Sequence, residues 1–96
     1  MYDPIRVVYL LHFDAPLGNL ANPRGQAQHY LGTTCDLHRR LQEHRSGNGS
    51  HIMAAVARRG IPWRLVRTWL GGRELELRLK GRKQASAFCP ICQRKF

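Results

Sequence analysis

The order of hydrophobic and polar positions divides the first third of the chain into two strands and a loop. Residues 5–13, "IRVVYLLHF", are mostly β-branched, aliphatic or aromatic, which is typical of a buried strand. Residues 14–28 hold two prolines, two glycines and two asparagines and predict a long loop. Residues 29–33, "HYLGT", predict a second strand, antiparallel to the first because neighbours in sequence usually pair.

The residues after the second predicted strand indicate two helices. Thr34 or Asp36 can cap a helix over roughly 36–46, in which Leu37 and Leu41 are the apolar positions. Ser50 can cap a second helix, "HIMAAVARRG", over residues 51–60.

The second half of the chain predicts one more strand and one more helix. Pro62 precedes an expected strand over roughly 63–70. Leu75 and Leu79 lie one turn apart in an expected helix over about 73–82. The tail, 84–96, shows no clear period. The fold class is therefore α/β, a small sandwich of order β-β-α-α-β-α, and we expect a single domain over 1–96 with its core at about 5–83.

The charge of the chain is large and uneven. The formal net charge is +10, and residues 1–36 carry two basic and three acidic groups against fourteen and three in residues 37–96. Thirteen of the sixteen basic residues are arginine, which suits bidentate contact with phosphate. The expected partner is a polyanion, nucleic acid before an anionic membrane surface.

Apolar runs and the number of cysteines bear on the cellular compartment of the protein. No apolar run reaches the length of a membrane span, and no signal peptide is evident at the N-terminus. Three cysteines, an odd number, do not form a disulfide framework and favour a reducing compartment. We therefore expect a cytoplasmic protein with no membrane partner, a monomer or weak dimer.

Four polar side chains raise the question of chemistry. Helical spacing places Arg40 and His44 on or beside the face of Leu37 and Leu41, while Arg39 points away. Arg40 can equally lay its stem along the core edge and reach solvent. Tyr9 and Tyr30 fall in neighbouring strands, where a tyrosine often only packs with a wet hydroxyl.

Glu76 presents a similar choice on the third helix. It is one of only six acidic residues and lies on the flank of the apolar stripe. The simple alternative is an ion pair with Lys80, four residues later.

Taken together, these residues resemble a known family. The pattern "VVY" at 7–9, "YLG" at 30–32, Arg40 ten residues after Tyr30, and then Glu76 resembles the GIY-YIG endonucleases, especially their small stand-alone bacterial members. "GRELELRLK" and the proline-led "IPWRLVRTW" are similar to family segments too. The resemblance implies a central three-stranded antiparallel sheet flanked by helices, and a nuclease that hydrolyses phosphodiester bonds of nucleic acid, most naturally DNA, with one divalent metal.

The resemblance also implies a role for each site residue. Glu76 would bind Mg²⁺ or Mn²⁺, Arg40 would stabilise charge on the phosphate, and Tyr9 or Tyr30 would orient or deprotonate the water. His44 could assist as a base or as a phosphate contact. Further residues are expected to shape the site or to bind nucleic acid: Gly32 by allowing close approach, and Arg39, Arg45, Lys80 and Lys83 by their charge.

This sequence departs from the family pattern in places. Val7 stands where the first motif has its glycine, and Phe88 stands where some members carry an asparagine. The competing interpretations are a non-catalytic nucleic-acid-binding module on the same fold and a small structural protein of a larger assembly.

"CPIC", near the C-terminus, raises a second metal question. Cys89 and Cys92 have the spacing of half a zinc site. Because Cys35 and five histidines offer no second paired motif, the sequence favours plain thiols or a closing disulfide over structural Zn²⁺.

Overall fold

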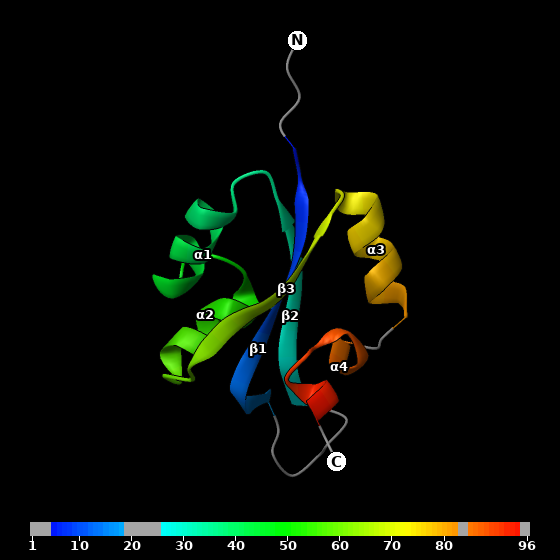
Figure 1. The fold of residues 1–96 in the computed structure, drawn as a ribbon. Helices are drawn as coiled ribbons and strands as arrows, with labels where there is room; N and C mark the ends of the chain where they lie inside the picture. The colour runs from blue at the N-terminus through cyan, green and yellow to red at the C-terminus, as the bar shows by residue number, and fades with distance from the viewer. Residues whose placement is uncertain (1–4, 19–25, 83–84, 95–96) are drawn as a thin grey trace.

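A computed structural model describes residues 5–18, 26–82 and 85–94. Three strands, β1 (Val7–Gly18), β2 (Gln26–Thr34) and β3 (Trp63–Leu70), form one antiparallel sheet in the order β2-β1-β3. The helices are α1 (Leu37–Arg45), α2 (His51–Arg58) and α3 (Arg73–Gly81), followed by the short α4 (Ala85–Phe88) and a 3-10 helix, η2 (Cys92–Arg94). The predicted fold class and the order β-β-α-α-β-α are therefore confirmed (Figure 1).

The loop predicted over 14–28 is wrong at both ends. Residues 14–18 belong to β1 and residues 26–28 to β2, and the pairing resumes with Leu17 opposite Ala27. The register shifts between His12 and Leu17. Such an irregularity accommodates Pro16, which has no N–H to give to the sheet. The tail without a clear period contains α4 and η2.

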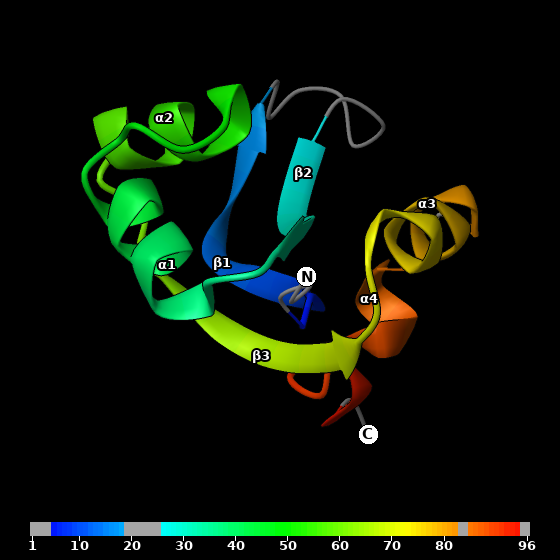
Figure 2. The ribbon, with the colours of Figure 1, turned by 90° about the horizontal axis from the view of Figure 1, so that it is seen from above.

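The sheet has a separate apolar core on each face, and its strands supply alternate residues to the two. Helices α1 and α2 cover one face and α3 and α4 the other (Figures 1 and 2). On the first face, Tyr9, Leu11 and Phe13 pack with Met53 and Val56 of α2. On the second, the core residues are Val8, Leu10, Leu31, Leu79 and Cys89.

Side-chain caps fix where α1 and α2 begin. The Asp36 carboxylate accepts a hydrogen bond from the Arg39 amide at 3.1 Å, and Ser50 Oγ accepts one from the Met53 amide, also at 3.1 Å. Of the two caps proposed for the first helix, the structure therefore uses Asp36, while Thr34 Oγ1 accepts from the Asp36 amide. The Asp36 cap fixes where α1 begins, and helical spacing from that point places Arg40 and His44 on the side of the sheet.

Among the described residues, no helix is both long enough and apolar enough to cross a membrane.

Candidate functional site

Tyr9 and Tyr30 lie side by side on the face of the sheet that α1 covers. Tyr9 is opposite Gly32 in the strand register and Tyr30 is opposite Leu11, and the two ring centroids are 6.1 Å apart. A Cβ on Gly32 would lie 2.6 Å from the Tyr9 hydroxyl and 2.9 Å from the Tyr30 ring. The side chains that occupy the space left by Gly32 are thus the two tyrosines.

His44 completes this group from α1. It is fully buried, and its Nε2 lies 2.8 Å from the Tyr9 hydroxyl, with its ring edge-on to Tyr30 at a centroid distance of 5.3 Å. Its other nitrogen, Nδ1, has no hydrogen-bond partner among the described residues. Whichever nitrogen carries the proton, one hydrogen lies between Tyr9 and His44.

The surroundings keep His44 uncharged near neutral pH. Burial, and secondarily the charge of Arg40, lowers the pKa of His44 from 6.5 to about 4. A neutral imidazole can accept a proton but offers no positive charge to a phosphate.

Tyr9 is also held in its neutral form. Burial raises the pKa of the Tyr9 phenol to about 12, and the hydrogen bond from Arg40 opposes this only in part. The Tyr9 hydroxyl is consequently the centre of a contacting group of four side chains, which we term the tyrosine cluster: Tyr9, Tyr30, Arg40 and His44.

Within the tyrosine cluster, Arg40 is the residue that extends to the surface. Its hydrogen bonds, first with Tyr9, raise its pKa further, so the guanidinium stays charged. Nη1 pairs with the Glu43 carboxylate at 3.1 Å, and the side chain is 31% exposed. It also lines a hollow of about 290 Å³ with Arg6, Thr33, Thr34 and Arg39. Arg40 therefore contacts the tyrosines and still reaches solvent.

Arg39 differs from its neighbour as predicted. Its side chain is 75% exposed and its Nε lies 3.7 Å from Glu43, a weak surface pair.

Glu76 lies on α3, which covers the opposite face of the sheet from α1. Its side chain is nearly buried, and Oε2 pairs with Lys80 Nζ at 3.3 Å. The simple ion pair suggested by the sequence is thus present. Among the described residues, no hydrogen bond or ion pair joins Glu76 to the tyrosine cluster.

A cavity at the β2 edge brings the two sides near each other. It has a volume of about 330 Å³, and its walls include Tyr30 from β2, Ile52 from α2, and Lys80 from α3. Because β2 is an edge strand, this cavity lies between the helices of both faces. Tyr30 and the partner of Glu76 therefore open into the same space.

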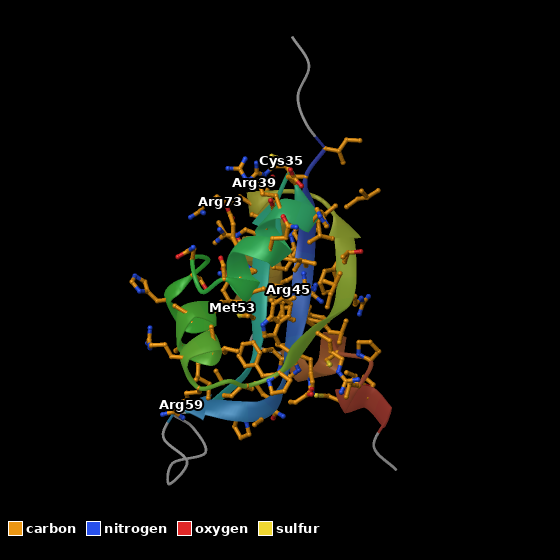
Figure 3. All side chains as sticks on the ribbon, turned by 90° about the vertical axis from the view of Figure 1, so that its left-hand side faces the viewer. Cys35, Arg39, Arg45, Met53, Arg59 and Arg73 are labelled. Atoms are coloured by element: carbon orange, nitrogen blue, oxygen red, sulfur yellow. The ribbon has the colours of Figure 1, made fainter. Side chains whose placement is uncertain are left out.

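The other residues expected to bind nucleic acid are scattered. Arg45 is exposed and its guanidinium lies over the Trp63 ring at 5.2 Å, while Lys83 lies outside the described residues. Figure 3 shows Arg39 and Arg73 near the end where α1 and α3 begin, and Arg59 at the opposite end.

The structure forms a second cluster of functional groups, of which the sequence indicated only the two cysteines of "CPIC". On the α3 face, where β1 and β2 pair His12 with His29, these two histidines meet the two thiols of "CPIC". The ligand atoms of these four residues all lie within 4.8 Å of one another and could hold a metal ion; we term them the His/Cys cluster: His12, His29, Cys89 and Cys92.

The sequence offers no second paired motif for Cys89 and Cys92, but the structure places one histidine from each of two facing strands beside the two thiols. None of the three cysteines forms a disulfide in the structure. In the sequence, the feature that indicates these ligands is one histidine in each of the two strands expected to pair, His12 and His29.

No protein-family model matches this chain, and neither a curated protein nor a solved structure matches it. The GIY-YIG resemblance therefore depends on the sequence motifs alone.

Proposed function

We propose that this protein is a metal-dependent endonuclease of the GIY-YIG type that hydrolyses phosphodiester bonds of nucleic acid, DNA in the first instance. The observation that carries the proposal is the tyrosine cluster. A buried hydroxyl, Tyr9, contacts both a neutral histidine and a charged arginine that reaches the surface. A proton acceptor and a phosphate-binding cation are thereby joined at one point.

Arg40 binds the scissile phosphate in this proposal. Its charge is secured by the tyrosine hydroxyls and by Glu43, and its side chain lines a surface hollow together with Arg39. A guanidinium fixed in this way can stabilise the negative charge that develops on the phosphate oxygens in the transition state.

Tyr9 and His44 move the proton of the attacking water. With a pKa of about 12, Tyr9 is not a phenolate at neutral pH, so it passes a proton rather than supplying an anion. As the water gives a proton to the Tyr9 oxygen, the Tyr9 hydroxyl gives its own to His44 Nε2, 2.8 Å away. A phosphate on Arg40 offsets the charge that helps to depress the His44 pKa, which makes His44 a better base when substrate is bound.

Glu76 fits the requirements of a Mg²⁺ ligand. Its carboxylate is nearly buried, and its ion-pair partner Lys80 lines the same cavity as Tyr30. Mg²⁺ needs only one or two protein carboxylates when water and phosphate oxygens fill its other positions. When bound, the ion would neutralise charge on the phosphate and on the leaving oxygen.

The charge of the chain favours a nucleic-acid substrate. Fourteen of the sixteen basic residues lie in residues 37–96, the part of the sequence that contains Arg40 and Glu76. A chain this rich in arginine is suited to contact with a phosphate backbone.

The test compares two glutamates on α3. We expect Mg²⁺ or Mn²⁺ to support cleavage in a screen of plasmid, branched and single-stranded DNA, and Glu76→Gln to slow it by about a hundredfold or more. Glu74→Gln, an exposed residue in the first turn of the same helix, is the matched control and should cleave normally. Cleavage undiminished in Glu76→Gln would remove Glu76 from the mechanism.

A non-catalytic binding module is the second candidate, and one observation favours it. The Glu76 carboxylate is already neutralised by Lys80 at 3.3 Å, which competes with a metal ion. This alternative expects salt-dependent binding of the same DNA with no metal-dependent cleavage of any substrate. That result would overturn the nuclease proposal while leaving the nucleic-acid partner in place.

A further inference from the structure

We propose that the protein binds one structural Zn²⁺ ion through the His/Cys cluster, His12, His29, Cys89 and Cys92. This site lies on the α3 face of the sheet, whereas the tyrosine cluster lies on the α1 face. It shares no residue with the proposed catalytic group, and the proposal does not depend on nuclease activity.

The spacing of the ligand atoms matches a tetrahedral zinc site. His12 Nδ1 lies 3.3 Å from His29 Nε2, 3.5 Å from Cys89 Sγ and 3.8 Å from Cys92 Sγ, and His29 Nε2 lies 3.4 Å from Cys92 Sγ. The usual zinc–nitrogen and zinc–sulfur bond lengths at tetrahedral angles give about 3.4 Å between two nitrogens and about 3.6 Å between nitrogen and sulfur. Four of the six distances among these atoms thus agree with tetrahedral zinc, and all six lie within 4.8 Å, close enough for one small cation.

Hydrogen bonding cannot account for this convergence. His12 Nδ1 faces a nitrogen and two sulfurs at once, yet an imidazole nitrogen carries either one hydrogen or one lone pair. It can therefore satisfy one of its three neighbours. An ion at the centre satisfies all of them, because each atom then directs a lone pair at the metal.

The donor set selects zinc. Two sulfurs and two imidazole nitrogens in a compact group are the ligands of tetrahedral Zn²⁺, whereas Mg²⁺ takes oxygen ligands. Two thiolates and two neutral imidazoles bring the charge of the bound site to zero, which suits its burial: Cys89 is fully buried and His12 is 7% exposed. Binding releases the two thiol protons.

Four protein ligands leave no open position, so the role is structural. The two histidines come from the paired strands β1 and β2, and the two cysteines flank the turn between α4 and η2. One ion would therefore fasten the C-terminal segment to the sheet. His29 and Phe88 also line the cavity at the β2 edge, so the ion would brace one wall of that cavity.

The first test is the metal content of untagged full-length protein, purified without chelator. We expect about one equivalent of zinc per chain, and a cobalt-substituted sample with the intense visible bands of a tetrahedral site and a thiolate charge-transfer band. Less than about half an equivalent of zinc, or the weak spectrum of octahedral cobalt, would overturn the proposal.

The second test uses Cys35 as an internal control. Cys35 is exposed and lies outside the His/Cys cluster. Mass spectrometry after brief alkylation should find Cys35 modified in the zinc-loaded protein, with Cys89 and Cys92 modified only after a strong chelator is added. Labelling that the chelator does not change would contradict the site.

Single variants separate the ligands from their neighbours. Cys92→Ser and His29→Asn should lose most of the bound zinc, while Cys35→Ser and His38→Gln, two exposed positions, should retain it. Zinc retained equally by all four variants would show that the metal lies elsewhere. If the ligand variants fail to fold, the cobalt spectrum of the unaltered chain still decides the question.

Discussion

At the scale of single residues, the tyrosine cluster places polar side chains next to an apolar core. Tyr9 and His44 have no exposed surface, yet each carries a titratable group. Burial moves both pKa values away from neutrality, upward for Tyr9 and downward for His44, so that both side chains are uncharged at pH 7. The charge of the cluster is concentrated on Arg40.

The lowered pKa of His44 predicts a loss of stability in mild acid. Between pH 6.5 and about 4 the unfolded chain protonates this side chain while the folded chain does not, so the free energy of unfolding falls as pH falls through that window. The loss attributable to His44 approaches about 3 kcal/mol at the acid end. Urea unfolding at a series of pH values measures it.

The control for this experiment lies on the same helix. His44→Gln should flatten the dependence on pH, whereas His38→Gln, at an exposed position of α1, should leave it unchanged. Any contribution from the His/Cys cluster is common to every variant, so the difference between variants reports His44. An equal slope in His44→Gln and the unaltered chain would contradict the assignment.

At the scale of elements, α1 delivers two of the four cluster residues, and its N-terminal cap decides how accurately it does so. The Asp36 carboxylate satisfies the Arg39 amide within the first turn, one residue before Arg40. The same kind of cap begins α2 at Ser50, which bonds the Met53 amide at the same distance, 3.1 Å. The two caps form a natural pair for comparison.

Removing either cap should cost similar stability but different activity. Asp36→Ala and Ser50→Ala should each lower the free energy of unfolding by about 1 kcal/mol, measured by urea denaturation. Only Asp36→Ala loosens the turn that positions Arg40, so it alone should slow DNA cleavage when both are assayed well below their unfolding midpoints. Equal loss of cleavage in the two variants would mean that the cap acts through global stability.

At the scale of the whole molecule, helices from both faces of the sheet line one cavity at the β2 edge. Side chains from both faces line its cavity, including Tyr30 from one side and Lys80 from the other. The chain has a net charge of +10, and Figure 3 shows Arg39 and Arg59 toward opposite ends of the α1–α2 side. A polyanion bound near Arg40 would meet Arg39 first.

This placement predicts how DNA binding depends on salt. The logarithm of the association constant should fall linearly with the logarithm of salt concentration, and Arg39→Ala should reduce the slope by about one. Arg59→Ala is the control, since Arg59 follows α2 at the other end of that side, and its slope should stay close to that of the unaltered chain. Fluorescence anisotropy with labelled DNA measures both slopes, and equal changes in the two variants would contradict a binding face at Arg39.

Much of the fold followed from local signals. The positions of α1 and α2 were readable because Asp36 and Ser50 cap them, and β3 because Pro62 precedes it. The extent of β1 and β2 was not readable, because Pro16 and the glycines of residues 14–28 are typical of a loop. Strand pairing between distant residues outweighed those local preferences.

The sequence by itself determined the fold class, the element order, and the inward turn of Arg40 and His44, because periodicity and capping are properties of neighbouring residues. Tertiary structure alone decided which side chains touch. It brought the Tyr9 hydroxyl to His44 across 35 positions, and it set His12 opposite His29 beside the two thiols of the tail. These contacts depend on strand register and on how helices pack over the sheet, which no short stretch of sequence encodes.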